Sequence, residues 1–259
     1  MATDTQISPY EIKGGASSRT LRFFWLLDVS GSMAGKKIKT LNWAIKEVIP
    51  ELEAIEDTER IKILMSAIAF DEEAWWHIGP DGVPLNEFLN RWQDLEAGSI
   101  TETQKAIDKL TEALDAKKMG KRNVPPVAIL ISDGYCTAPE EEYKKSIDRL
   151  NSIPWGKKAV RLSIGISSGD GIDYNKEELD MFISPYLRDG DEKVETLHAD
   201  NPQKLVRFIK IASTTASVSS SRSSDSSQES IKPVDIKPDA LTQTPLIEDL
   251  SIDDADEVF

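Results

Sequence analysis

Apolar runs that look like strands alternate with helical segments along most of this 259-residue chain, and this alternation limits the possible folds more than any other feature. Uninterrupted apolar runs indicate buried strands, and apolar residues spaced three and four apart indicate amphipathic helices. Such alternation predicts an α/β fold, a doubly wound, Rossmann-like and mostly parallel sheet flanked by helices. The predicted strands are Arg22–Val29, Arg60–Phe70, Glu73–Ile78, Pro126–Ser132, Val160–Ile166 and Val194–Ala199.

Helices are expected between these strands. The first has one apolar face from about Lys36 to Ile55, and Pro50 within it predicts a kink. A tight turn at Asp71–Glu72 makes the third strand antiparallel to the second. The remaining helices are expected to begin near Thr101, Pro139, Asn175 and Asn201, and the last to end near Ala212.

The composition changes near residue 213. Residues 217–230 are mostly serine, and such a segment cannot offset the entropy lost on ordering. This tail is a solvated linker, a segment that is phosphorylated on its serines or, through the acidic and apolar residues of 246–259, a segment that docks on a partner. The chain is accordingly divided into an N-terminal extension (1–19), a folded domain (20–212) and a flexible, Ser-rich acidic tail (213–259).

The charge of the chain excludes several classes of protein. Lys and Arg number 31 against 45 Asp and Glu, a net charge of -14, which disfavours binding to nucleic acid or to an anionic membrane. No apolar run approaches the roughly 20 residues that span a bilayer, and the polar N-terminus lacks a signal core, so a cytoplasmic protein is expected. A single cysteine, Cys136, and two histidines, His77 and His198, leave little room for a Cys/His metal site or His-based catalysis.

Two loops are the expected ligand-binding region. With the strand order 3-2-1-4-5-6, the first and fourth strands are neighbours where the order reverses, and ligands bind beyond their carboxyl ends. The first loop is D28-V-S-G-S-M-A-G35, in which Gly31 permits a tight turn that lets both serine hydroxyls face the same point as Asp28. The second loop begins with Asp133-Gly134.

The chemistry of these loops indicates a cation. Asp28 and Asp133, with no basic side chain or histidine expected beside them, repel each other unless a cation lies between them. Carboxylate and hydroxyl oxygens suit a hard ion, Mg²⁺ first. The structural alternative is that Asp28 caps the first helix and that the serines are turn residues.

These residues resemble the metal-ion-dependent adhesion site of the von Willebrand factor A (VWA) family, which has the form D-x-S-x-S, a distant Thr, and an Asp in a strand-end D-G. The segment G98-S-I-T-E-T103 is one residue longer than the family's G-x-T-x-T, and its register favours Thr101 as the ligand with Thr103 as its neighbour. The resemblance covers about residues 20–212. It implies that Mg²⁺, or Mn²⁺ or Ca²⁺, is held by Asp28, Ser30, Ser32, Thr101 and Asp133.

Three stretches are similar to the cytoplasmic VWA proteins of bacterial tellurium-resistance (Ter-type) and related stress loci: FFWLLDVSGSMAGKKI, AIAFDEEA and LEAGSITETQKAI. This resemblance implies an interaction module in a stress-response, tellurium-resistance or phage-defence complex. The implied partner is another protein that supplies an Asp or Glu to the metal, such as a Ser/Thr kinase, a phosphatase or another Ter-type protein.

The alternative is an Mg²⁺-dependent phosphatase or hydrolase. A phosphatase with an aspartate nucleophile needs a second acid two residues later, and Ser30 stands there. A serine hydrolase needs a base near Ser30 or Ser32, and neither histidine is expected in the loops of this edge. We therefore expect a binding module rather than an enzyme, with no catalytic residues.

Overall fold

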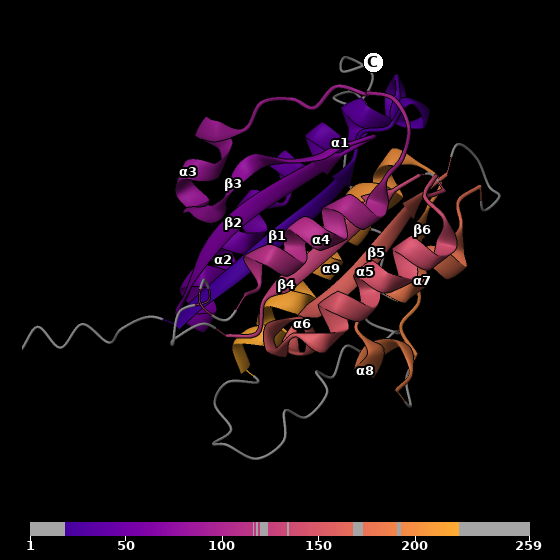
Figure 1. Cartoon of the computed structure of the whole chain (residues 1–259). Coiled ribbons are helices and arrows are strands. Elements are labelled where there is room, and N and C mark those ends of the chain that lie inside the picture. Colours follow the sequence, from indigo (N-terminus) through magenta and orange to yellow (C-terminus); the bar gives the residue numbers. More distant parts are fainter. Residues whose placement is uncertain are drawn as a thin grey trace, which may run out of the picture.

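A six-stranded sheet forms the centre of the molecule, with the strand order β3-β2-β1-β4-β5-β6 (Figure 1). The computed structural model describes residues 19–115, 117, 119, 124–133, 135–167, 173–190 and 193–222. The strands are β1 Arg19–Asp28, β2 Ile61–Phe70, β3 Ala74–Pro84, β4 Val127–Ser132, β5 Val160–Ile166 and β6 Leu197–Ala199. Neighbouring strands are parallel except β2 and β3, which are antiparallel. The predicted fold class, the strand order and the direction of the third strand are confirmed.

Helices cover both faces of the sheet (Figure 1). Each face has its own apolar cluster, and the helices divide between the two clusters. On one face lie α1 Lys36–Glu47, α2 Ile49–Glu59, α3 Leu85–Arg91, α8 Pro185–Arg188 and α9 Pro202–Arg222. On the other lie α4 Thr103–Ala113, α5 Glu140–Ser152, α6 Pro154–Lys158 and α7 Lys176–Phe182. One layer of helices on each face of a single sheet is the doubly wound arrangement that the alternation of elements predicts.

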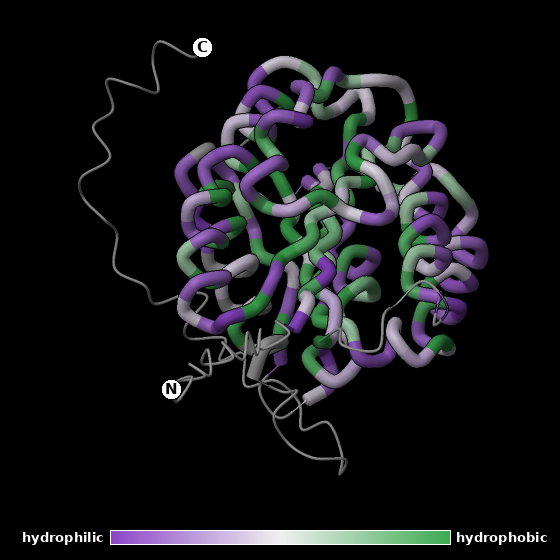
Figure 2. Tube along the Cα trace, turned by 90° about the vertical axis from the view of Figure 1, so that its left-hand side faces the viewer, coloured by the Kyte–Doolittle hydropathy of each residue, from purple (hydrophilic) through white to green (hydrophobic). Residues whose placement is uncertain are grey.

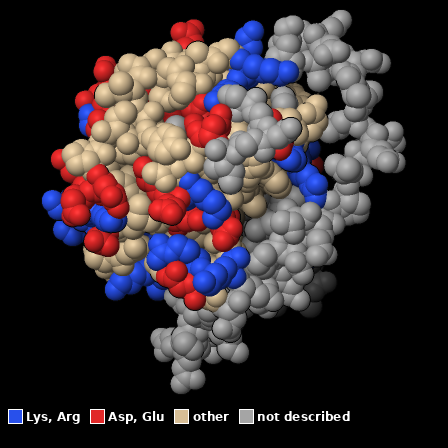
Figure 3. Space-filling view, turned by 90° about the vertical axis from the view of Figure 1, so that its right-hand side faces the viewer, with Lys and Arg blue, Asp and Glu red and all other residues tan. Residues whose placement is uncertain are grey.

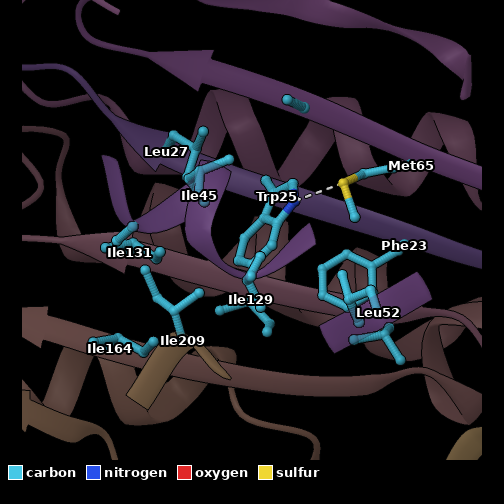
Figure 4. Packing of buried hydrophobic residues seen from close by; sticks show 14 of the residues in the cluster. Phe23, Trp25, Leu27, Ile45, Leu52, Met65, Ile129, Ile131, Ile164 and Ile209 are labelled. Atoms are coloured by element: carbon cyan, nitrogen blue, oxygen red, sulfur yellow. Dashed lines mark hydrogen bonds between the residues drawn. The ribbon is translucent and has the colours of Figure 1, made fainter. Parts of the chain in front are cut away.

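Strand β1 anchors both clusters because successive side chains of a strand point to opposite faces. Its apolar residues are fully buried on both faces of the sheet. Phe23, Trp25 and Leu27 lie on the face of α1, and Phe24 and Leu26 lie on the face of α4. Trp25 Nε1 donates to Met65 Sδ over 3.2 Å, in the middle of the cluster that Figure 4 shows. Figure 2 shows the same distribution, with hydrophobic residues along the sheet and hydrophilic residues on the outer sides of the helices. Burial of each large apolar side chain stabilises the fold by about 1.5–3 kcal/mol, so the carboxyl end of β1 is firmly placed.

Two predicted helices differ from the observed ones. The single kinked helix over residues 36–55 is two helices, α1 and α2, and Pro50 lies in the first turn of α2, where its missing N–H costs no hydrogen bond. The predicted end near Ala212 is wrong, because α9 continues to Arg222. Ser213 and Ser217 are buried and follow Ile209 at four-residue spacing, so small residues continue the inner face of the helix. The rest of the predicted tail, 223–259, and residues 1–18 lie outside the described residues.

Acidic and basic side chains are interspersed on the face of the molecule that Figure 3 shows. Ion pairs across the described surface include Lys176 with Asp180 at 2.6 Å and Lys46 with Asp94 at 2.7 Å. Exposed pairs of this kind contribute at most about 1 kcal/mol each, so they do not decide the fold. Among the described helices, none combines the length and the apolar composition that crossing a bilayer requires.

Candidate metal centre

Strands β1 and β4 lie side by side at the point where the strand order reverses, and their carboxyl ends carry the predicted acids. Asp28 is the last residue of β1 and is fully buried. Its Oδ1 accepts a hydrogen bond from Ser30 N at 2.8 Å, and its Oδ2 accepts one from Ser132 Oγ at 2.5 Å. Since both carboxylate oxygens are held, the orientation of Asp28 is fixed by the protein itself.

The two predicted serines connect Asp28 to Asp133. Ser30 precedes a short 3-10 turn, Gly31–Met33, and its Oγ lies 3.1 Å from Ser32 Oγ. Ser32 Oγ in turn donates to Asp133 Oδ1 over 2.8 Å. Hydrogen bonds thus join Asp28, Ser30, Ser32 and Asp133 into one continuous group, which we call the site cluster.

Gly31 allows a second loop to approach the site cluster. Its N–H donates to the Ser99 carbonyl over 2.7 Å. A Cβ at this position would lie 3.2 Å from that carbonyl oxygen and 3.3 Å from the Gly98 carbonyl oxygen, which is closer than most real Cβ contacts. A glycine at this position therefore lets the loop that leads to Thr101 pack this closely without displacement of its carbonyl groups.

Thr101 lies at the same edge of the sheet and is only 5% exposed. Its carbonyl accepts hydrogen bonds from Thr137 N at 2.7 Å and from Thr137 Oγ1 at 2.8 Å, in the loop after β4. The next residue, Glu102, donates its N–H to the Asp71 carbonyl after β2. Thr103, its predicted neighbour, is the first residue of α4 and is buried. These contacts hold the backbone of Thr101 near the site, and the role of its hydroxyl as a ligand stays a prediction.

A basic side chain, Lys37, accompanies the two carboxylates, so the expectation that none lies beside them is wrong. Lys37 Nζ forms an ion pair with Asp133 Oδ2. The side chain of Asp133 is fully buried and that of Lys37 is 18% exposed. The spacing of apolar residues identifies the helix that carries Lys37, but it does not tell which way a side chain in the first turn folds, which is why sequence reasoning missed it.

The surroundings of Asp28 disfavour a negative charge on its carboxylate. Burial and, to a smaller extent, the neighbouring Asp133 raise the pKa of Asp28 from 3.8 to about 6, against the opposing effect of hydrogen bonds from Ser132 and Ser30. A cation at the site cluster reverses this balance, because it favours the ionised carboxylate. The cluster therefore gains from a positive ion beside Asp28.

The donor set consists of two carboxylates and the hydroxyl groups around them. Within the described ranges, no group of three or more His, Cys, Asp or Glu side chains is positioned to hold a metal ion. A metal at this edge thus depends on serine and threonine oxygens, and oxygen ligands alone suit Mg²⁺, Mn²⁺ or Ca²⁺. The residues fit such an ion by their chemistry and by their position at the carboxyl edge of the sheet.

A hollow of about 280 Å³ lies beside the loop that follows Asp133, with Tyr135, Cys136 and Glu178 among its lining residues. Cys136 N donates to Glu178 Oε1 over 3.1 Å. Burial raises the pKa of the Cys136 thiol and raises that of Glu178 to about 7. The thiol is therefore protonated at neutral pH and is a poor nucleophile.

Comparison with known proteins agrees with the fold. Residues 24–186 match the family profile of the von Willebrand factor type A domain. A search of curated protein sequences gave no match. Among solved structures, a von Willebrand factor type A protein from Catenulispora acidiphila superposes with a TM-score of 0.58 at 16% identity, covering 77% of this chain and 43% of that one.

A second similar structure is the proximal thread matrix protein 1 (PTMP1) of the mussel byssus, with a TM-score of 0.54 at 16% identity over 77% of this chain and 47% of that one. The same mussel protein with a zinc-occupied MIDAS motif gives 0.53 at 15% identity, over 76% and 48%. At these identities the likeness shows the fold. The present chain spans less than half the length of these relatives.

Proposed function

Because the chain belongs to the von Willebrand factor type A domain family, whose members generally act as protein-interaction modules, we propose that it binds a partner protein through a divalent metal ion. The observation that carries this proposal is the site cluster, in which Asp28, Ser30, Ser32 and Asp133 form one hydrogen-bonded group. The cluster collects oxygen ligands at the ligand-binding edge of an α/β sheet.

Mg²⁺ is the proposed ion, with Mn²⁺ or Ca²⁺ as alternatives. The ligands are Asp28, Ser30, Ser32, Thr101 and Asp133. Two carboxylates balance the charge of one divalent ion, and neutral hydroxyls add coordination without further repulsion. The zinc found in the motif of the mussel protein supports a divalent ion at this place in the fold. When bound, the ion supplies a positive charge that accepts an additional oxygen ligand.

The partner supplies that ligand as the carboxylate of an Asp or Glu. Two exposed apolar side chains flank the predicted ligands, Ile100 beside Thr101 and Tyr135 two residues after Asp133, with 49% and 57% of their surface exposed. Exposed large apolar side chains around a polar centre are typical of interaction surfaces. We therefore expect apolar residues next to the acid of the partner.

The same geometry argues against the alternative of a phosphatase or hydrolase. His77 lies on β3, with its ring 4.8 Å from that of Trp92, and β2 separates this strand from β1. His198 lies on β6, next to Tyr174, and β5 separates this strand from β4. Neither histidine is placed to act as a base for Ser30 or Ser32. This arrangement supports a binding role rather than an enzymatic one.

The cellular setting that we propose is a cytoplasmic stress-response, tellurium-resistance or phage-defence complex with a Ser/Thr kinase, a phosphatase or another Ter-type protein. The support for this setting is the resemblance of three sequence stretches, including LEAGSITETQKAI, to the VWA proteins of such loci.

Affinity capture from the host tests the interaction. The bait is the full chain in three forms: wild type, Asp28→Ala, and the control Asp148→Ala, which changes an exposed aspartate on α5. We expect partners that wild type and the control retain in Mg²⁺, that EDTA releases, and that Asp28→Ala does not capture. Partners retained equally by all three baits in EDTA contradict a metal-bridged interaction. A phosphatase assay of the wild type with and without Mg²⁺ tests the enzymatic alternative.

A further inference from the structure

Both carboxylate oxygens of Asp133 are already engaged by the protein. Oδ1 accepts from Ser32 Oγ over 2.8 Å, and Oδ2 pairs with Lys37 Nζ. This ion pair is shielded, because the side chain of Asp133 is fully buried. A shielded pair interacts more strongly than one at the surface, and salt screens it less. Any second cation that approaches Asp133 therefore meets a positive charge that is already in place.

The position of Lys37 in its helix is unfavourable by local rules. The first turn of α1 contains no acidic residue, and its N-cap is Gly35, which has no side chain to cap the helix. The N-terminal end of a helix carries a partial positive charge and disfavours a lysine by a few tenths to about 1 kcal/mol. The attraction that offsets this cost in the structure is the contact with Asp133, next to the carboxylate of Asp28.

We propose that Lys37 is a built-in counter-ion of the metal centre, which a divalent cation must displace from Asp133 in order to bind. This inference rests on the proposed function, since it presumes that Asp133 contributes to a metal site. The ammonium group and a divalent ion cannot both lie against one buried carboxylate without strong repulsion. The cost of breaking the ion pair is subtracted from the metal affinity, and by linkage a bound metal weakens the hold on Lys37 to the same extent.

The side chain of Lys37 is able to leave. It is 18% exposed, and a lysine carries its charge on a flexible four-carbon stem that can reach solvent while the stem stays packed. Metal binding thus releases a positive charge at the mouth of the site, where the proposed partner carboxylate arrives. Lys37 sets the concentration of divalent ion at which the site fills, and with it the concentration at which partner binding begins.

Titration calorimetry with Mg²⁺ tests this role of Lys37. The proteins are wild type, Lys37→Met, which keeps the length and apolar stem of the side chain, and Lys39→Met, the same change at an exposed position of the same helix. We expect Lys37→Met to bind Mg²⁺ about tenfold or more tightly than wild type, and Lys39→Met to bind as wild type does. Lys37→Arg keeps the charge and should remain within a few-fold of wild type.

Thermal unfolding gives a second readout that does not depend on partner binding. In EDTA, Lys37→Met should unfold at a lower temperature than wild type, because Asp133 loses its counter-ion. In saturating Mg²⁺ this difference should disappear, because the metal has replaced the lysine in both proteins. Lys39→Met should show no such dependence on the metal.

The outcomes separate this inference from the proposed function. If wild type and Lys37→Met bind Mg²⁺ with equal affinity, Lys37 is not a counter-ion that the metal displaces, although the metal site itself stands. Binding by Lys37→Met alone supports the role strongly. If neither protein binds Mg²⁺, Mn²⁺ or Ca²⁺, and both unfold at the same temperature with and without the ions, the metal site and the role of Lys37 are both wrong.

Discussion

Helices α1 and α5 both begin at the carboxyl edge of the sheet, one after β1 and the other after β4, yet their first turns are opposite in charge. Helix α5 starts after Pro139 with Glu140, Glu141 and Glu142, and Glu140 pairs with Lys144 one turn later. Helix α1 starts after Gly35 with two lysines and no acid. Acids at a helix N-terminus are favourable and lysines are not, so α5 follows the local rule and α1 violates it.

The difference shows what each helix start faces. The acidic first turn of α5 is exposed, and Glu140 pairs with Lys144 of the same helix. The first turn of α1 faces the site cluster, where Lys37 pairs with the buried Asp133. In α5 the local preference holds, whereas in α1 it is overridden by the ion pair between Lys37 and the buried Asp133.

Reversing the charge of Lys37 is the strongest way to break this comparison. By the helix rule alone, Lys37→Glu improves the first turn of α1 and should stabilise the protein slightly. By the site geometry, it places a third carboxylate beside Asp28 and Asp133, so we expect unfolding in EDTA to become easier by about 2–4 kcal/mol. Chemical denaturation in EDTA and in Mg²⁺ measures this, and Mg²⁺ should restore most of the loss. A variant more stable than wild type in EDTA contradicts the account.

The pH dependence of stability tests the electrostatics of the site through the titration of Asp28. Its pKa is about 6 in the folded protein and near 3.8 in the unfolded chain, so the folded state holds this proton more tightly. The contribution of Asp28 to stability is thus fully present below about pH 4 and is lost as the pH rises through 6, by an amount on the order of 3 kcal/mol.

The measurement is denaturant unfolding in EDTA between pH 4 and 7 for wild type and Asp28→Asn, which removes the titration but keeps the shape. The stability of wild type relative to the variant should fall across this range. A difference that stays constant with pH shows that Asp28 titrates normally and that its burial does not strain the metal-free site.

Reversing a charge in α5 has the smallest expected effect. Glu141→Lys replaces an exposed acid in the first turn and should cost at most about 1 kcal/mol, with the cost shrinking as salt is added. Thermal unfolding at low and high ionic strength measures it. The affinity for Mg²⁺ should be unchanged, and a large loss of metal binding in this variant contradicts the separation of the two helix starts.

The sheet was predictable because its signal is spread over many residues. Apolar runs such as Phe23–Leu27 are buried on both faces, and the alternation of strands with helices leaves few possible topologies. The D-x-S-x-S pattern, which begins at the last residue of β1, and the Asp133-Gly134 pair after β4 were recognisable because each follows a predicted strand, and the carboxyl ends of neighbouring parallel strands bring them together. The contacts among Asp28, Ser30, Ser32 and Asp133 confirm that the structure assembles them.

The features that sequence reasoning missed have only a weak signal in the sequence. Strand β6 begins at Leu197 rather than Val194, and helix α3 is a short helix after Pro84 without a long periodic pattern. The continuation of α9 depends on buried serines, which composition alone assigns to a solvated tail. The ion pair of Lys37 depends on a side-chain direction, which no spacing of residues encodes.

Titration of the purified full chain with Mg²⁺, followed by calorimetry, tests the central claim that the site cluster holds a divalent ion. Wild type and the control Asp148→Ala should bind one ion per chain, and Asp28→Ala, with its circular dichroism spectrum unchanged, should show no saturable heat. Asp28 is fully buried at the end of β1 and is held by Ser30 and Ser132, so its carboxylate has no substitute at this position. Equal Mg²⁺ affinity in Asp28→Ala and wild type contradicts a metal centre at this edge of the sheet.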